Sequence, residues 1–105
     1  MNESNLRIET LKEYLAENPD DSFSQYALAL EYDKAGNRVK AMELLEFLVA
    51  QNPDYLAAYY QLGKLYESNG DSSKATDVYE RGIVIAQKQK NLKTMNELRA
   101  AIDII

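Results

Sequence analysis

The chain has 105 residues, the size of one ordinary domain, and can bury a core without help from disulfides or metals. It contains no cysteine and no histidine, which excludes disulfides, cysteine- or histidine-based zinc sites and catalysis by a Cys nucleophile or a His base. Its 17 acidic and 12 basic residues give a net charge of −5, which disfavours nonspecific binding to nucleic acids and anionic lipids. We expect no cofactor, no metal, no nucleic acid partner and no membrane partner.

The N-terminal segment from Met1 to Thr10 lacks the basic flank and apolar run of a signal peptide. The longest apolar run, Tyr55 to Tyr60, is much shorter than the ~18 residues that a membrane span requires. These features predict a cytoplasmic protein, or a cytoplasmic part of a larger protein.

The first predicted helix covers residues 4–18 and ends where Asn18 precedes Pro19. Its apolar residues recur mostly at spacings of three and four, which is typical of an amphipathic helix. They are Leu6, Ile8, Leu11, Tyr14 and Leu15. We expect this stripe to cover the apolar face of the helices that follow.

Residues 18–86 contain an internal repeat with a period of 34 residues. Ten positions coincide at this shift: Asn18/Asn52, Pro19/Pro53, Asp20/Asp54, Tyr26/Tyr60, Leu28/Leu62, Tyr32/Tyr66, Gly36/Gly70, Lys40/Lys74, Ala41/Ala75 and Glu46/Glu80. Each copy reads as two helices joined by a glycine-containing turn, at 22–35 and 38–52 and then at 56–69 and 72–88. We expect Asp20 and Asp54 to N-cap the first helices, and Asn37 and Asp71 the second helices. Gly36 and Gly70 should supply the left-handed turn between them.

Small residues within each copy indicate where its two helices cross closely: Ala29, Ala41, Gly63 and Ala75. A last amphipathic helix is predicted at 92–104, with an apolar stripe of Leu92, Met95, Leu98, Ile102 and Ile105. We expect it to cap the second copy. The lysines before it, Lys88, Lys90 and Lys93, are interpreted as solvated surface.

A 34-residue helix–turn–helix period is the signature of the tetratricopeptide repeat (TPR), and the chain resembles that family. The residues that carry the resemblance are Leu28, Ala29, Tyr32, Ala41, Leu45 and Pro53, and then Leu62, Gly63, Tyr66, Ala75 and Tyr79. The chain departs from the pattern where Gln25 and Tyr59 replace the usual tryptophan and where Gln87 replaces the second closing proline. The last helix fits the first-helix pattern with two inserted residues, so that Leu98 takes the place of Leu62.

The resemblance implies an all-α fold, a short α-solenoid of antiparallel helix pairs with about six helices in a right-handed superhelix. One TPR domain, 1–105, would comprise an N-terminal packing helix at 4–18, repeats at 22–55 and 56–89, and a capping helix at 92–105. It also implies a non-catalytic protein-interaction module that binds a peptide or helix of a partner protein in its concave groove. The implied groove residues are Phe23, Tyr26, Leu30, Asp33, Lys34, Tyr60, Gln61, Lys64 and Glu67.

Within this groove we expect Tyr26 and Tyr60 to contact the partner, and Tyr32 and Tyr66 to pack between helices. The family's carboxylate clamp for chaperone tails is absent, because Tyr26, Leu30 and Gln61 stand where it needs lysine and asparagines. No chaperone ligand is therefore expected. The alternative function is a structural one, in which the apolar C-terminal helix packs on a second copy or a neighbouring domain. Acidic pairs such as Asp20 and Asp21 lack an accompanying nucleophile, so enzymatic activity is not predicted.

Overall fold

The computed structural model describes residues 3–105, so Met1 and Asn2 of the predicted domain lie outside the described residues. The described residues form six α-helices and no strand, which confirms the all-α prediction. The helices are α1 (Glu3–Glu17), α2 (Ser22–Lys34), α3 (Arg38–Gln51), α4 (Ala57–Ser68), α5 (Ser72–Lys88) and α6 (Leu92–Ile104). Each boundary lies within one residue of its predicted position.

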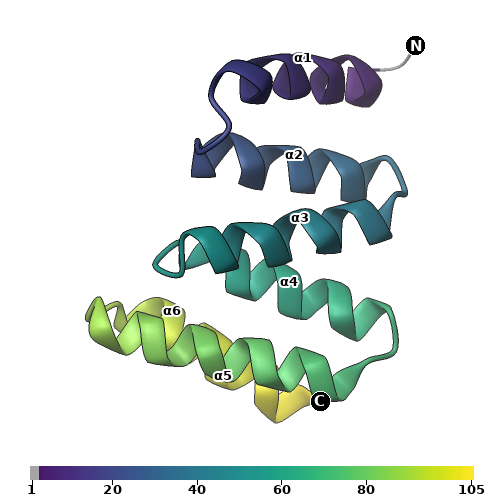
Figure 1. Cartoon of the computed structure of the whole chain (residues 1–105). Coiled ribbons are helices and arrows are strands. Elements are labelled where there is room, and N and C mark those ends of the chain that lie inside the picture. The colour runs from purple at the N-terminus through teal and green to yellow at the C-terminus, as the bar shows by residue number, and fades with distance from the viewer. Residues whose placement is uncertain (1–2) are drawn as a thin grey trace. The chain divides into compact units, whose positions relative to one another are not determined.

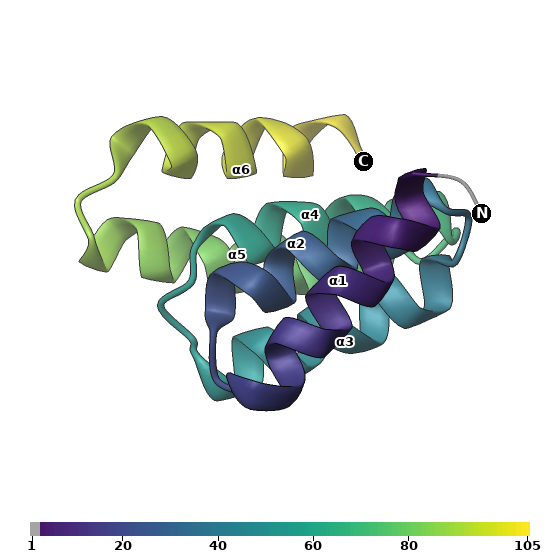
Figure 2. The same ribbon diagram turned by 90° about the horizontal axis from the view of Figure 1, so that it is seen from above.

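The chain divides into two compact units, residues 1–52 and residues 53–105. In the first unit α2 packs against both α1 and α3, and Figure 1 shows these three helices running in alternating directions. In the second unit α5 packs against both α4 and α6, and Figure 2 shows α6 lying antiparallel to α5. That residues 1–105 form one domain with a superhelical twist stays a prediction.

Three of the connections use the same turn. The residue with positive φ is Gly36 (85°) between α2 and α3 and Gly70 (78°) between α4 and α5, as predicted. Between α5 and α6 it is Lys90 (57°). The residue that follows donates its N–H to a carbonyl five residues earlier in every case: Asn37 to Tyr32, Asp71 to Tyr66 and Asn91 to Ala86. Lys90 therefore stands where the repeats have glycine, at a steric cost of about 1 kcal/mol.

The second helix of each repeat is capped as predicted. The side chains of Asn37 and Asp71 accept hydrogen bonds from the backbone N–H groups of Lys40 and Lys74, at 3.2 and 3.0 Å. Asn91 caps α6 in the same way.

The predicted caps of the first helices are wrong. Asp21, not Asp20, caps α2, because Asp21 is the extended residue directly before the helix and accepts from the N–H of Ser24. Asp20 instead accepts a hydrogen bond from the side chain of Gln51 at 2.6 Å.

In the second repeat α4 has no side-chain cap. The residue after Asp54 is Tyr55, which lacks the short acceptor side chain that Asp21 supplies in the first repeat. The backbone carbonyl of Asp54 accepts from Nε2 of Gln89 at 2.7 Å, so this loop is held to the end of α5 rather than to its own helix.

Small residues lie at the helix crossings, as predicted. Ala29, Ala41 and Ala75 are almost completely buried. At Gly63 an added Cβ would lie 2.2 Å from Cε1 of Tyr79, so α4 can approach α5 only because this position has no side chain.

The N-terminal helix covers α2 with part of its predicted stripe. Ile8 is buried and Leu11 and Leu15 are half-buried, whereas Leu6 and Tyr14 are exposed. Leu6 and Tyr14 therefore do not belong to the core, contrary to prediction.

The C-terminal helix covers α5 with Leu98 and Ala101, which form a core cluster with Ala75 and Tyr79. A second glycine allows this approach, because a Cβ on Gly82 would lie 3.0 Å from Cδ1 of Leu98. The burial of Leu98 fits the predicted frame, in which it takes the place of Leu62.

The two ends of the predicted α6 stripe, Leu92 and Ile105, are exposed, contrary to prediction. Leu92 is the first residue of the helix and Ile105 follows its last turn, so neither reaches the neighbouring helix along its length.

Candidate functional site

The first predicted binding face lies on α2. Phe23 is 70% exposed, and Tyr26 and Leu30 are half-buried. Their spacing of three and four residues places them on one side of the helix. Asp33 and Lys34 are exposed at its C-terminal end. The first unit thus presents an apolar stripe, defined as Phe23, Tyr26 and Leu30, that ends in charged residues.

An ion pair that sequence periodicity did not indicate joins α1 to α2. Nε of Arg7 donates to Oε1 of Glu31 at 2.6 Å, and Nζ of Lys34 lies 3.7 Å from the same oxygen. The bond from Arg7 is the main reason why the pKa of Glu31 is lowered, against the opposing effect of burial. Lys34, a predicted groove residue, therefore also interacts within its own helix.

The second predicted face lies on α4 and is tied to the core of its unit. Tyr60 is half-buried, and its ring centroid lies 6.3 Å from that of Tyr79. Nζ of Lys64 lies 5.3 Å from the centre of the Tyr60 ring and 3.7 Å from Oε2 of Glu67. Gln61, the residue after Tyr60, is half-buried.

The hydroxyl of Tyr79 donates a hydrogen bond to the carboxylate of Glu67. Burial first, and then this carboxylate, raise the pKa of Tyr79, so the phenol stays protonated and keeps donating. Glu67, predicted to face a partner, thus accepts a hydrogen bond from a core residue. Tyr60, Lys64, Glu67 and Tyr79 form one connected group, which we call the α4–α5 network.

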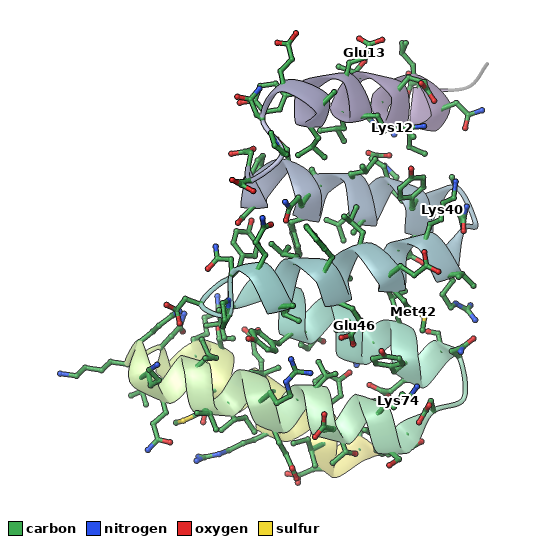
Figure 3. All side chains as sticks on the ribbon, in the orientation of Figure 1. Lys12, Glu13, Lys40, Met42, Glu46 and Lys74 are labelled. Atoms are coloured by element: carbon green, nitrogen blue, oxygen red, sulfur yellow. The ribbon has the colours of Figure 1, made fainter. Side chains whose placement is uncertain are left out.

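Tyr32 and Tyr66, which are predicted to pack between helices, are half-buried and have a contact absent from the predictions. Nζ of Lys40 lies 5.5 Å from the ring centre of Tyr32, and Nζ of Lys74 lies 5.7 Å from that of Tyr66. Figure 3 labels both lysines, each near the start of the second helix of its repeat. The two copies therefore have in common a cation–π contact as well as a helix crossing.

The two replacements of the usual tryptophan make equivalent contacts. Gln25 and Tyr59 are both buried. Nε2 of Gln25 donates to the carbonyl of Pro19, and the hydroxyl of Tyr59 donates to the carbonyl of Pro53, each at 2.6 Å. Burial raises the pKa of Tyr59. Each side chain fastens the Asn-Pro-Asp loop before its own helix.

Within residues 3–105 no group of three or more acidic side chains is arranged to hold a metal ion. None of the described helices combines the length and the apolar character of a membrane span. The predicted binding residues lie on two faces, one in each unit, and their union in a single groove stays a prediction.

A sequence profile of the tetratricopeptide repeat matches residues 33–102 of the chain. A search of curated protein sequences gave no significant match.

Solved structures share the fold. The solution structure of a tetratricopeptide repeat domain protein from Salinibacter ruber is 43% identical, with a TM-score of 0.77, over 80% of this chain and 85% of that one. A crystal structure of the tetratricopeptide repeat domain protein from the same organism is 43% identical, with a TM-score of 0.74, over 78% of this chain and 91% of that one.

The crystal structure of MamA protein is 27% identical, with a TM-score of 0.77. The match covers 85% of this chain but 49% of MamA, so this chain spans about half of that protein's length. These similarities fit a helical repeat fold over most of the chain.

Proposed function

The chain belongs to the tetratricopeptide-repeat family, and we propose that it is a non-catalytic module that binds a peptide or helix of a partner protein. Helical repeat arrays commonly use their extended surfaces for binding. The proposed contact residues are those predicted from the repeat: Phe23, Tyr26, Leu30, Asp33, Lys34, Tyr60, Gln61, Lys64 and Glu67.

The observation that carries the proposal is the exposure of Phe23. An aromatic side chain that is 70% exposed contributes little to the core, and it continues the apolar stripe of Tyr26 and Leu30 on α2. Aromatic side chains are enriched among the residues that dominate binding energy at interfaces. The exposed charges of Asp33 and Lys34 then provide the polar rim at one end of the stripe.

The test is affinity capture from the source lysate with the wild-type chain and three variants. Phe23→Ala and Tyr26→Ala should each weaken capture of the same partner, by about 1–3 kcal/mol when the purified pair is titrated. Phe47→Ala is the matched control, because Phe47 is 55% exposed on α3 of the same unit. Equal capture by the Phe23 and Phe47 variants would refute a site on the α2 face.

A second candidate function is self-association through the C-terminal helix, because Ile104 is 78% exposed at its end. Ile105 is also exposed, whereas Ile102 is half-buried and packs against the core cluster of its unit. Light scattering on an Ile104→Glu variant tests this function. A loss of association relative to the wild-type chain would support it, and an unchanged monomeric mass for both would reject it.

A further inference from the structure

The net charge of the chain belongs entirely to its first unit. Residues 1–52 contain 10 acidic and 5 basic residues, a net charge of −5, and residues 53–105 contain 7 of each, a net charge of 0. The two units therefore differ in net charge, although each contains a copy of the same repeat. Charge asymmetry of this kind favours contacts between unlike ends of two molecules.

An acidic surface lies at the connection between α1 and α2. Glu17 and Asp20 are exposed and Asp21 is half-buried, and Phe23 projects from the first turn of the helix that follows. None of these three carboxylates forms an ion pair with a described residue. We call Glu17, Asp20, Asp21 and Phe23 the acidic junction.

A basic surface, also made of three charged residues and one apolar residue, lies at the connection between α5 and α6. Lys88, Lys90 and Lys93 are exposed, and Leu92, which is 65% exposed, projects from the first turn of α6. The three ammonium groups form no ion pair within residues 3–105. We call these four residues the basic junction. Asp54, whose backbone carbonyl bonds to Gln89, is a carboxylate near it but pairs with none of the lysines.

We propose that the basic junction of one molecule docks on the acidic junction of a second copy of this chain, with Leu92 seated against Phe23 and the apolar stripe of α2. Three cations without ion-pair partners meet three carboxylates without ion-pair partners, and each set lies close in sequence to one exposed apolar side chain. Surface charges alone contribute little, so the buried contact between Leu92 and Phe23 supplies the anchor while the charges select the orientation. This docking does not depend on the proposed partner function, although it covers Phe23.

The contact joins two different surfaces, so each added molecule leaves one junction of each kind unused. A head-to-tail contact of this type continues into longer oligomers unless its rotation closes a ring. The same arrangement would occupy the α2 stripe and compete with a partner protein for it.

Sedimentation velocity between about 10 µM and about 1 mM protein covers the range expected for a small, charge-assisted interface. The average sedimentation coefficient of the wild-type chain should rise with concentration, and the rise should shrink when salt is raised from about 50 to about 500 mM. Phe23→Ala and Leu92→Ala should each reduce association about tenfold, whereas Phe47→Ala and Ile104→Glu should leave it unchanged.

A charge swap decides the orientation. One variant, Lys88→Glu with Lys93→Glu, makes both junctions acidic, and another, Glu17→Lys with Asp20→Lys, makes both basic. Each should stay monomeric alone, and their mixture should associate; circular dichroism checks that both fold. A wild-type chain that is monomeric throughout, association that the single variants do not weaken, or a mixture that stays monomeric while the wild type associates would each overturn the proposal.

Discussion

The size relation between Gly63 and Tyr79 is a quantitative test of how the second unit packs. A Cβ at position 63 would lie 2.2 Å from Cε1 and 2.6 Å from Cδ1 and Cζ of Tyr79, well inside van der Waals contact. Tyr79 is completely buried and its hydroxyl is bonded to Glu67, so the ring has little room to move. The first repeat has Ala29 and Leu45 at the same two places. The first repeat therefore combines a larger residue on the first helix with a smaller one on the second, and the second repeat does the reverse.

We expect Gly63→Ala to destabilise the chain. Overpacking a core costs about 1–3 kcal/mol, and a 2.2 Å contact with a confined ring belongs at the upper end of that range, about 2–3 kcal/mol. The better helix propensity of alanine returns about 1 kcal/mol, so the net loss is about 1–2 kcal/mol. For a chain of this size such a loss lowers the melting temperature by about 4–8 °C per kcal/mol. Tyr79→Leu alone should cost about 1–3 kcal/mol, because it leaves a cavity beside the glycine.

The double variant Gly63→Ala with Tyr79→Leu reproduces the pair of the first repeat. It should be more stable than the sum of the single losses predicts, by at least about 1 kcal/mol of coupling. Urea denaturation followed by circular dichroism at 222 nm measures all four proteins of the cycle. Losses that simply add would show that α4 and α5 do not meet at this contact and would refute the packing described here.

Three further predictions concern stability. Lys90→Gly should stabilise the chain by about 0.5–1 kcal/mol in a thermal melt, because glycine adopts the positive φ of this turn without strain; a destabilised variant would contradict that conformation. The pKa of Glu31 is lowered from its ordinary 4.5, so its pairing with Arg7 stabilises the fold above that pH and is lost as pH falls through the folded value. Arg7→Gln should therefore flatten the acid side of the stability curve, and identical acid titrations would rule out the pair. Deleting residues 91–105 should produce aggregation or dye binding, since it uncovers Tyr79 and Ala75, whereas deleting residues 103–105 should not; a soluble, equally heat-stable truncation would reject the covering role of α6.

Local features of the fold were predictable from sequence because each is decided within a few residues. The turns at Gly36 and Gly70 are predictable because a left-handed conformation favours glycine, and the cap at Asn37 is predictable because a short acceptor side chain commonly precedes a helix. The predicted cap of α2 lies one residue too early, because Asp20 and Asp21 both carry the required carboxylate. Only the backbone conformation distinguishes them.

Contacts between distant residues were not predictable in the same way. Arg7 and Glu31 lie 24 residues apart on different helices. Periodicity predicts which face of α1 is apolar, but it does not predict which residues of α1 lie opposite which residues of α2. The left-handed turn at Lys90 is also not predictable from the sequence, because the residue there is lysine rather than glycine and the closing proline of the repeat is missing. Its geometry follows from how α6 packs on α5.

The predicted difference between the two tyrosine pairs needs revision in the second unit. Tyr26 and Tyr60 occupy the same repeat position, but the first repeat has Leu45 where the second has Tyr79, the residue beside Tyr60. The larger Tyr79 reaches the ring of Tyr60 at 6.3 Å, so Tyr60→Ala removes a core contact as well as any partner contact. Melting temperature and binding will therefore fall together at Tyr60. Phe23 carries no such ambiguity, because most of its side chain is in solvent, and a loss of binding at Phe23 without a loss of stability identifies the surface on α2 directly.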